Sequence, residues 1–494
     1  MSLLTRLARR FSSGSTTTTV DVPVLKTFDS PQEFWIELTS KCPFDCVFCS
    51  RASLRGKGEH MDFALYQSLI SQMRRPRIIR LNYSGESIHY PHLAKAISLA
   101  KATGARVELV TALSSAKPKI IEALVREKLD RLTISIHALS EPLYQQIYGY
   151  SSSNSLNESL QLLLSLKQKL NSFFPVIDFA FVAMERNLEE LPSIAALAQA
   201  MGVVQIDIHP VIRRDEIAEA FSNELIAGNL TAYFHAKLSK SLIELAQNYP
   251  NLSLNVSSKE LEKIPDLGVQ PVAYPLELPQ GAKIFSCEQN PWDTVHVLAN
   301  GDVVSCEVRD QQPLGNLTDT DLHSIWHGSE YATFRRNYVQ AVDEKCRKCI
   351  YKFAYTSSDQ FEIKSYLRPT ECQNQLLSGW HLAEAKHVWS STYNARALLA
   401  WPSGASRIII SGLLPPSERD EENNLRVIVA GVEHCVVNSG DKHLPFHVDI
   451  RMPTLSESII RIDFNISHTF SPQKQNPKAD ARQLGFLLSE IRCH

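Results

Sequence analysis

The stretch that decides the fold is Lys41-Cys42-Pro43-Phe44-Asp45-Cys46-Val47-Phe48-Cys49-Ser50, which carries three cysteines within eight residues. A cluster of four irons and four sulfides needs one thiolate for each iron. A loop that supplies Cys42, Cys46 and Cys49 therefore leaves one iron open to another ligand. The alternative is a structural zinc site, which needs a fourth ligand, and no Cys or His lies within ten residues on either side.

The residues around this loop predict where it lies in a fold. Residues 34–38 form an apolar run directly before the cysteines, so the loop follows the carboxyl end of a buried strand. Parallel α/β sheets and barrels build their sites at that end of the strands. A second apolar run, 78–83, is followed by Ser84-Gly85-Glu86-Ser87. The glycine permits close backbone approach, and the acid is suited to a charge-assisted hydrogen bond.

These two motifs resemble those of the radical SAM superfamily. The resemblance implies that S-adenosylmethionine binds the open iron through its amino and carboxylate groups and that Phe48 packs against the adenine. Ser84, Gly85 and Glu86 correspond to the family's Gly-Gly-Glu-Pro motif, which receives the amino group, although Ser84 replaces a glycine and Ser87 a proline. Two further cofactor contacts are expected, with a turn or capping role as the alternative for each. They are Ser135 and Asn187.

The region from about 30 to 215 alternates β-branched runs with amphipathic stretches, which predicts βα units. Right-handed crossovers then give a parallel sheet curled into a partial (β/α)6 barrel. The expected strands are 34–38, 78–83, 107–111, 132–136, 179–184 and 204–209. The expected helices lie near 63–73, 92–102, 119–127, 156–170 and 188–201.

A second set of cysteines follows, namely Cys287, Cys306, Cys346 and Cys349, separated by 18, 39 and 2 residues. The segment resembles the SPASM extension of larger radical SAM maturases, in the shortened form called twitch. That resemblance implies one auxiliary 4Fe-4S cluster with four thiolates, in a small cysteine-rich α+β domain. Tetrahedral zinc is the alternative for this spacing.

From about residue 378 the pattern changes to short alternating runs between Pro, Gly, Asn and Asp turns, which predicts an antiparallel β-sandwich. This part resembles a module of polysaccharide-synthesis enzymes, in which Trp380 and Trp389 would stack on sugars; a tryptophan in a sandwich core is the alternative. The expected organisation is a basic tail (1–28), a radical SAM core (29–240), an auxiliary-cluster domain (241–375) and a sandwich (376–494).

Composition excludes several other functions. With 51 basic and 53 acidic residues, the net charge of −2 gives no electrostatic case for nucleic acid binding. The sequence contains no run of 18 apolar residues, so no membrane-spanning helix is predicted. Iron–sulfur clusters and free thiols favour a reducing compartment, so a cytoplasmic protein is expected. The basic, Ser/Thr-rich first 20 residues keep an organellar location open.

The radical SAM resemblance implies an enzyme of the oxidoreductase class. It would cleave S-adenosylmethionine reductively to a 5′-deoxyadenosyl radical that takes hydrogen from the substrate, with the auxiliary cluster accepting an electron and a flavodoxin or ferredoxin-type protein as reductant. Glu307 and Asp310, beside Cys306, are the candidate proton acceptors. A carbohydrate-type substrate is expected. The alternatives are a SPASM-type peptide or protein maturase and a non-catalytic zinc-bound scaffold that recognises glycan.

Overall fold

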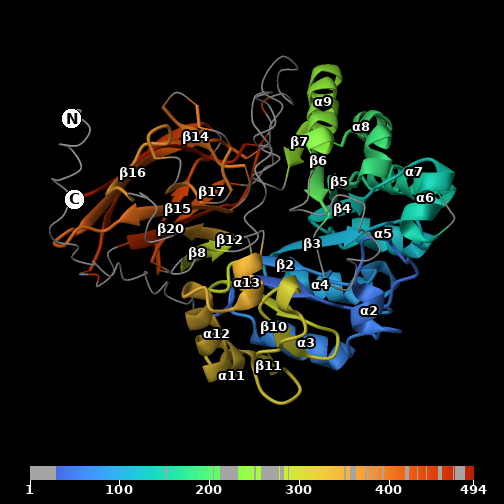
Figure 1. Cartoon of the computed structure of the whole chain (residues 1–494), viewed down its shortest axis with the longest axis horizontal. Helices are drawn as coiled ribbons and strands as arrows, with labels where there is room; N and C mark the ends of the chain where they lie inside the picture. The colour runs from blue at the N-terminus through green and yellow to red at the C-terminus, as the bar shows by residue number, and fades with distance from the viewer. Residues whose placement is uncertain are drawn as a thin grey trace, which may run out of the picture.

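The structure is a computed structural model that describes residues 29–150 without interruption and most of 153–494. The longest gaps are 212–231, 257–277, 356–362 and 473–483, and several shorter gaps also occur. The expected tail, 1–28, lies outside the described residues. Two hydrophobic cores are present, one in an α/β unit and one in a β-sandwich at the opposite side of the molecule (Figure 1).

The α/β unit is built on one ten-stranded sheet of order β11-β10-β9-β1-β2-β3-β4-β5-β6-β7. Strands β1 to β7 pair in parallel, as the βα alternation predicts. Their bounds are β1 Glu33–Ile36, β2 Ile78–Arg80, β3 Arg106–Thr111, β4 Arg131–Ser135, β5 Val176–Ala183, β6 Gln205–Pro210 and β7 Ser253–Val256. The six expected strands and the α/β fold class are confirmed. Strand β7 continues the sheet past residue 240, where the sequence predicted a domain boundary.

Helices connect these strands, as right-handed crossovers require. They are α2 Arg51–Arg55, α3 Phe63–Gln72, α4 Leu93–Ala102, α5 Pro118–Arg126, α6 Glu141–Tyr148, α7 Ser153–Lys169, α8 Leu191–Ala200 and α9 Ala232–Asn248. Local signals explain their ends. The Asp62 side chain caps α3 by accepting from two backbone N–H groups, and Gly149 ends α6 with φ of 61°.

Alternation along the strands separates an apolar outer face from a polar inner face. In β4, Leu132 and Ile134 are fully buried under helices, whereas Arg131, Thr133 and Ser135 are half-buried on the other face. Since successive side chains of a strand point to opposite faces, the second set lines the inside of the curled sheet. The polar lumen is therefore encoded in the period-two pattern of each strand.

The segment with the second set of cysteines is joined to this sheet. Strand β9, Thr294–Val297, pairs in parallel with β1, and β10 (Asp302–Val304) and β11 (Gly315–Asn316) extend the sheet antiparallel. A two-stranded sheet of β8 (Lys283–Cys287) and β12 (Lys352–Tyr355) lies between the core and the sandwich (Figure 1). Among the described residues, the helices of the segment are α11 Leu322–Trp326, α12 Ser329–Val339 and α13 Glu344–Lys348.

The C-terminal part forms two packed antiparallel sheets, of order β13-β21-β16-β19 with β14 beside β21, and β15-β20-β17-β18. Their strands are β13 Tyr366–Leu367, β14 Val388–Trp389, β15 Asn394–Ala400, β16 Arg407–Leu414, β17 Asn424–Val429, β18 Val432–Asn438, β19 Leu444–Arg451, β20 Ile459–Ile466 and β21 Leu487–Cys493. Trp380 packs against Phe464 and Phe486, and its Nε1 donates to the Arg396 carbonyl at 2.7 Å. The core role weighed for Trp380 accounts for these contacts.

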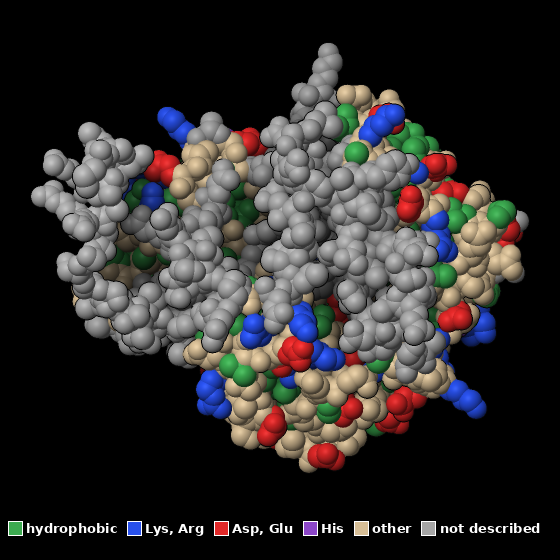
Figure 2. Space-filling model, viewed as in Figure 1, with side chains coloured by type: hydrophobic (Ala, Val, Ile, Leu, Met, Phe, Trp, Pro, Cys, Tyr) green, Lys and Arg blue, Asp and Glu red, His purple; other side chains and the backbone are tan. Residues whose placement is uncertain are grey.

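Two surface properties bear on the expectations from composition. Basic and acidic side chains are interspersed over the described part of the face drawn in Figure 2. Among the helices that the structure describes, none has the length and apolar character needed to cross a membrane.

Candidate active site

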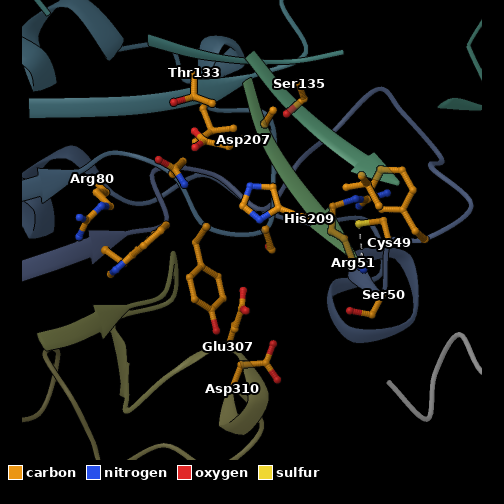
Figure 3. A pocket seen from close by; sticks show the side chains of 18 of the residues that line it. Cys49, Ser50, Arg51, Arg80, Thr133, Ser135, Asp207, His209, Glu307 and Asp310 are labelled. Carbon is orange, nitrogen blue, oxygen red and sulfur yellow. Dashed lines mark hydrogen bonds between the residues drawn. The ribbon is translucent and has the colours of Figure 1, made fainter. Parts of the chain in front are cut away.

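A cavity of about 650 Å³ opens inside the curled sheet toward the carboxyl ends of its strands. Its walls are formed by residues of strands β1 to β6, of the loops that follow them and of the segment around Cys306. The three-cysteine loop gives Phe48 and Cys49, and the segment after Cys306 gives Glu307 and Asp310. Figure 3 shows Cys49, Ser50 and Arg51 on one side, Arg80 on the other, and Glu307 and Asp310 facing His209. The remaining lining includes Glu33, Trp35, Asn82, Tyr83, Ser84, Glu108, Arg131, Thr133, Ser135, His137 and Asp207.

The three-cysteine loop is fixed by backbone hydrogen bonds to α6. The Asp45 N–H donates to the Tyr148 carbonyl at 2.9 Å and the Val47 N–H donates to the Ile147 carbonyl at 3.0 Å. Within the loop the Cys49 N–H donates to the Cys46 carbonyl at 2.9 Å. The thiols are thus carried on an anchored turn, with Cys49 the most exposed of the three.

Gly85 provides the second anchor of this loop. A Cβ at residue 85 would lie 2.2 Å from the Thr39 carbonyl oxygen and 2.8 Å from the Lys41 carbonyl oxygen. The next N–H, that of Glu86, donates to the Lys41 carbonyl at 2.9 Å. Only a residue without a Cβ permits this approach, so the glycine expected for close backbone contact lies directly against the start of the cysteine loop.

The thiols of the loop lie within electrostatic reach of one another. Burial raises the pKa of Cys42 to about 12, and Glu86 and Cys49 add to the shift. Burial, followed by the charges of Cys49 and Cys42, also raises the pKa of Cys46 well above its ordinary value. Two crowded, half-buried thiols, those of Cys42 and Cys46, favour the thiolate form only when a bound group brings compensating positive charge. The donor set fits an iron–sulfur cluster in that respect.

The second set shows the same pattern. Burial and then the charge of Cys287 raise the pKa of Cys306 to about 12. Burial raises the pKa of Cys346, and Asp343, Cys306 and Cys287 raise it further. Strand pairing of β8 with β12 sets Cys287 opposite Lys352, three residues past Cys349. All four thiols are therefore brought to one region, as the spacing predicts.

Neither set is contracted around a single ion. Within the part of the chain that the structure describes, no three His, Cys, Asp or Glu side chains converge closely enough to hold one metal ion.

Glu86 is placed as an acceptor. It is 5% exposed, and its Oε2 accepts from the Ala112 N–H at 2.9 Å. Its Oε1 is buried without a hydrogen bond of normal geometry among the described residues. Burial raises the pKa of Glu86 to about 7, against the effect of its hydrogen bonds. An orphaned carboxylate oxygen of this kind fits the amino group of S-adenosylmethionine.

Of the remaining expected cofactor contacts, Phe48 and Ser135 line the cavity, whereas Asn187 does not. Phe48 lines the cavity, with its ring edge-on to His137 at 4.9 Å, and Ser135 lines it from the end of β4. Asn187 is fully buried, and its amide donates to the His137 and Val182 carbonyls at 3.0 and 2.9 Å. Its side chain also accepts from the Met184 N–H, so the capping role weighed for Asn187 accounts for its contacts.

One residue that the sequence reasoning missed joins the two cysteine regions. Glu37, 1% exposed, follows β1, and its Oε1 accepts from the Ser84 hydroxyl. Its Oε2 accepts from the Ala299 N–H at 3.0 Å, at the hairpin before Cys306. Arg55 lies 3.6 Å from the same carboxylate and donates to Asp310 Oδ2 at 2.9 Å. Apolar patterning alone gives no signal for such a residue.

The lumen also carries paired charges that the motifs did not predict. Arg80 stacks over Trp35 at 4.8 Å and donates to Glu33 at 2.8 Å and to Glu108 at 3.1 Å. Burial raises the pKa of Glu33, but Arg80 and Arg77 overcome this and hold it below its usual range. The signal was present in the strand pattern, where single charged residues alternate with apolar ones.

Comparison with known families defines the class. Residues 36–198 match the Radical SAM superfamily, and residues 287–350 match SPASM, an iron–sulfur cluster-binding domain. The chain therefore contains a radical SAM domain followed by a SPASM-type segment, as the two cysteine motifs predicted. Two 4Fe-4S clusters and S-adenosylmethionine are the cofactors of these domains, which confirms the cofactor expectation.

Its similarity to particular proteins is more distant. The chain is 25% identical over 336 residues to a PqqA peptide cyclase of Xanthomonas campestris pv. campestris, covering 66% of this chain and 81% of the relative. A PqqA peptide cyclase of Gluconobacter oxydans is 25% identical over 183 residues, and the match spans about half (49%) of that relative. The fold is similar to Streptococcus suis SuiB bound to precursor peptide SuiA, with a TM-score of 0.50 at 12% identity over 66% of this chain and 72% of SuiB. The comparisons lend no support to a role in polysaccharide synthesis.

Proposed function

We propose that this protein is a radical SAM enzyme that modifies a peptide or protein substrate in the cavity between its two cysteine regions. The observation that carries the proposal is the shared lining: Phe48 and Cys49 from one region and Glu307 and Asp310 from the other bound the same space. A substrate held there contacts both regions at once. A peptide is favoured over the expected carbohydrate because the relatives of known activity are peptide cyclases.

The two cysteine sets are proposed as the ligands of the two clusters. Cys42, Cys46 and Cys49 would hold the cluster that binds S-adenosylmethionine. The auxiliary cluster would be held by Cys287, Cys306, Cys346 and Cys349. When bound, these groups supply a 5′-deoxyadenosyl radical for hydrogen abstraction and a site that accepts an electron.

The chain itself positions the cofactor and the substrate. Glu86 Oε1 is proposed to accept a hydrogen bond from the amino group of S-adenosylmethionine, and Phe48 to pack against its adenine. Ser135 is proposed to contact the ribose or the carboxylate. The enclosed lumen excludes water from the reacting atoms, which protects a radical from side reactions.

Glu307 is proposed as the proton acceptor. Both Glu307 and Asp310 line the cavity, and Asp310 accepts a hydrogen bond from Arg55 at 2.9 Å. A carboxylate at residue 307 would take a proton from a substrate held in the cavity, and the pair Asp310 and Arg55 would orient the wall from which it projects.

The experiment has two stages, with dithionite or a flavodoxin-type protein as reductant. The first reconstitutes the protein anaerobically, measures iron and sulfide, and follows 5′-deoxyadenosine after addition of S-adenosylmethionine. The second adds synthetic peptides encoded by short open reading frames beside the gene and, in parallel, free and nucleotide-linked sugars. The expected result is cofactor cleavage that is stimulated by one peptide, whose mass falls by two hydrogens or whose connectivity changes. Stimulation by a sugar and by no peptide would refute the peptide assignment.

A further inference from the structure

The outer face of one sheet of the sandwich is polar yet buried. Along β15 and β20 the residues that point away from the sandwich core include Arg396, Arg461 and Asp463, and Arg396 lies directly opposite Asp463 in register. Their exposures are 6%, 1% and 3%. The outer face of a sandwich sheet ordinarily meets water. Three charged residues buried on such a face require partners from another part of the chain.

Those partners lie in the turn that follows Cys287. Arg461 Nη1 donates to Asn290 Oδ1 at 3.0 Å, and Arg396 Nη2 lies 3.6 Å from Asp293 Oδ2. Within the sandwich, Arg461 Nε donates to Asp463 Oδ2 at 2.8 Å, and Arg396 Nε lies 3.4 Å from Asp463 Oδ1. Two arginines and two aspartates thus balance one another inside the contact, which offsets the cost of burying each charge.

The turn itself is strained and held from outside. Asn290 is fully buried with φ of 26°, a conformation that few residues other than glycine adopt. Its N–H donates to the Cys287 carbonyl at 3.2 Å, and its carbonyl accepts from the Thr294 N–H at 3.0 Å. A backbone in a sparsely populated region persists where its surroundings fix it. The hydrogen bond from Arg461 fixes the side chain of this residue.

We propose that Arg461 and Arg396 of the sandwich are positioning residues for the auxiliary cluster, acting through the turn that carries Cys287. The inference rests on the proposed function in one respect, the assignment of Cys287 as a ligand. The contacts of Arg461 with Asn290 and of Arg396 with Asp293 fix the turn that carries this ligand.

The same face also reaches the wall of the cavity. Asn394, at the start of β15, donates to Glu33 Oε1 at 2.6 Å, and Glu33 Oε2 accepts from Arg80 at 2.8 Å. Glu33 and Arg80 both line the cavity. The outer face of β15 and β20 thus contacts both the turn after Cys287 and a residue that lines the cavity. The sandwich therefore helps to position the site.

The test uses the full-length protein with Cys42, Cys46 and Cys49 replaced by alanine, so that the auxiliary cluster alone gives a signal. Arg461→Gln and Asn290→Ala are expected to lower iron per chain at least twofold, or to shift the EPR spectrum and midpoint potential of the remaining cluster. Asn290→Asp retains the acceptor oxygen and is expected to restore the signal. The matched control is Arg426→Gln, because Arg426 lies on the same sheet with its side chain 51% exposed. Auxiliary iron and spectra equal to the parent in both test variants would overturn the proposal.

A metal-free measurement separates positioning from a general folding defect. In the apoprotein, Arg461→Gln is expected to increase hydrogen exchange in residues 287–297 while the interior strands β16 and β21 remain protected. Increased exchange throughout the sandwich would reject the positioning role. If the parent protein binds no auxiliary cluster, the ligand assignment fails, whereas the exchange experiment still decides whether Arg461 holds the turn.

Discussion

Replacing Gly85 by alanine should displace the three-cysteine loop from its place beside the cavity. The new Cβ would lie 2.2 Å from the Thr39 carbonyl oxygen, whereas Cβ contacts closer than 3.0 Å essentially never occur. The backbone must therefore move by 3.0 − 2.2 = 0.8 Å or more. Overpacking of this kind costs about 1–3 kcal/mol, and loss of the hydrogen bond from the Glu86 N–H to the Lys41 carbonyl adds about 1 kcal/mol.

The assay for Gly85→Ala is iron per chain and 5′-deoxyadenosine formation after anaerobic reconstitution, together with the urea-unfolding free energy of the apoprotein. The expected result is loss of stability by about 2–4 kcal/mol and loss of most cofactor cleavage, with the auxiliary cluster retained. Gly202→Ala is the matched control, because its φ of 68° imposes backbone strain but its Cβ would meet nothing within 4 Å. Equal cleavage by both variants would refute the reasoning.

Three further predictions follow from the same site. Cys42→Ala should abolish cleavage of S-adenosylmethionine, whereas Cys346→Ala should retain cleavage but form no product. Normal product formation by the Cys346 variant would contradict the role of the auxiliary cluster. Cys435→Ala is the control for both, because Cys435 is a half-buried cysteine of the sandwich. Glu307→Gln should leave cleavage within twofold of the parent but slow product formation at least tenfold, and a product rate that stays parallel to cleavage would remove Glu307 as the base. Burial lowers the pKa of His137 to about 3, so below pH 6.5 the unfolded state binds a proton that the folded state does not. The free energy of unfolding therefore falls as the pH falls from 6.5 towards 3, by about 3 kcal/mol at pH 4. His137→Asn should reduce this loss of stability at acid pH in urea titrations, and an unchanged pH dependence would contradict the prediction.

The sequence predicted the parts of the fold that depend on local pattern. The six strands and the two cysteine regions follow from apolar periodicity and from ligand spacing, both of which act over short distances along the chain. Strand β7 escaped prediction because residues 212–231 separate it from the periodic region and its four residues carry little apolar signal.

The candidate site was predictable only where a motif marks it. Glu37 and Arg55 contact residues more than 250 positions away, Ala299 and Asp310 respectively, and no local pattern encodes such a pairing. Asn187 kept two interpretations, because a polar residue near a strand end serves equally well as a cofactor contact or as a cap. Of its three backbone hydrogen bonds, those with Met184 and Val182 are local, and only the one to the His137 carbonyl comes from tertiary packing, which periodicity does not report.

The parallel pairing of β9 with β1 has a consequence for the order in which this protein folds during synthesis. Glu33 and its partner Thr294 are 294 − 33 = 261 residues apart. At about 5–20 residues per second, the ribosome needs roughly 13–52 s to deliver the partner of the first strand. During that time one edge of β1 is unpaired, and an open strand edge promotes association between nascent chains. Glu33 places a charge on β1, and a charged side chain on an open strand opposes such association; in the folded protein this charge is paired with Arg77 and Arg80.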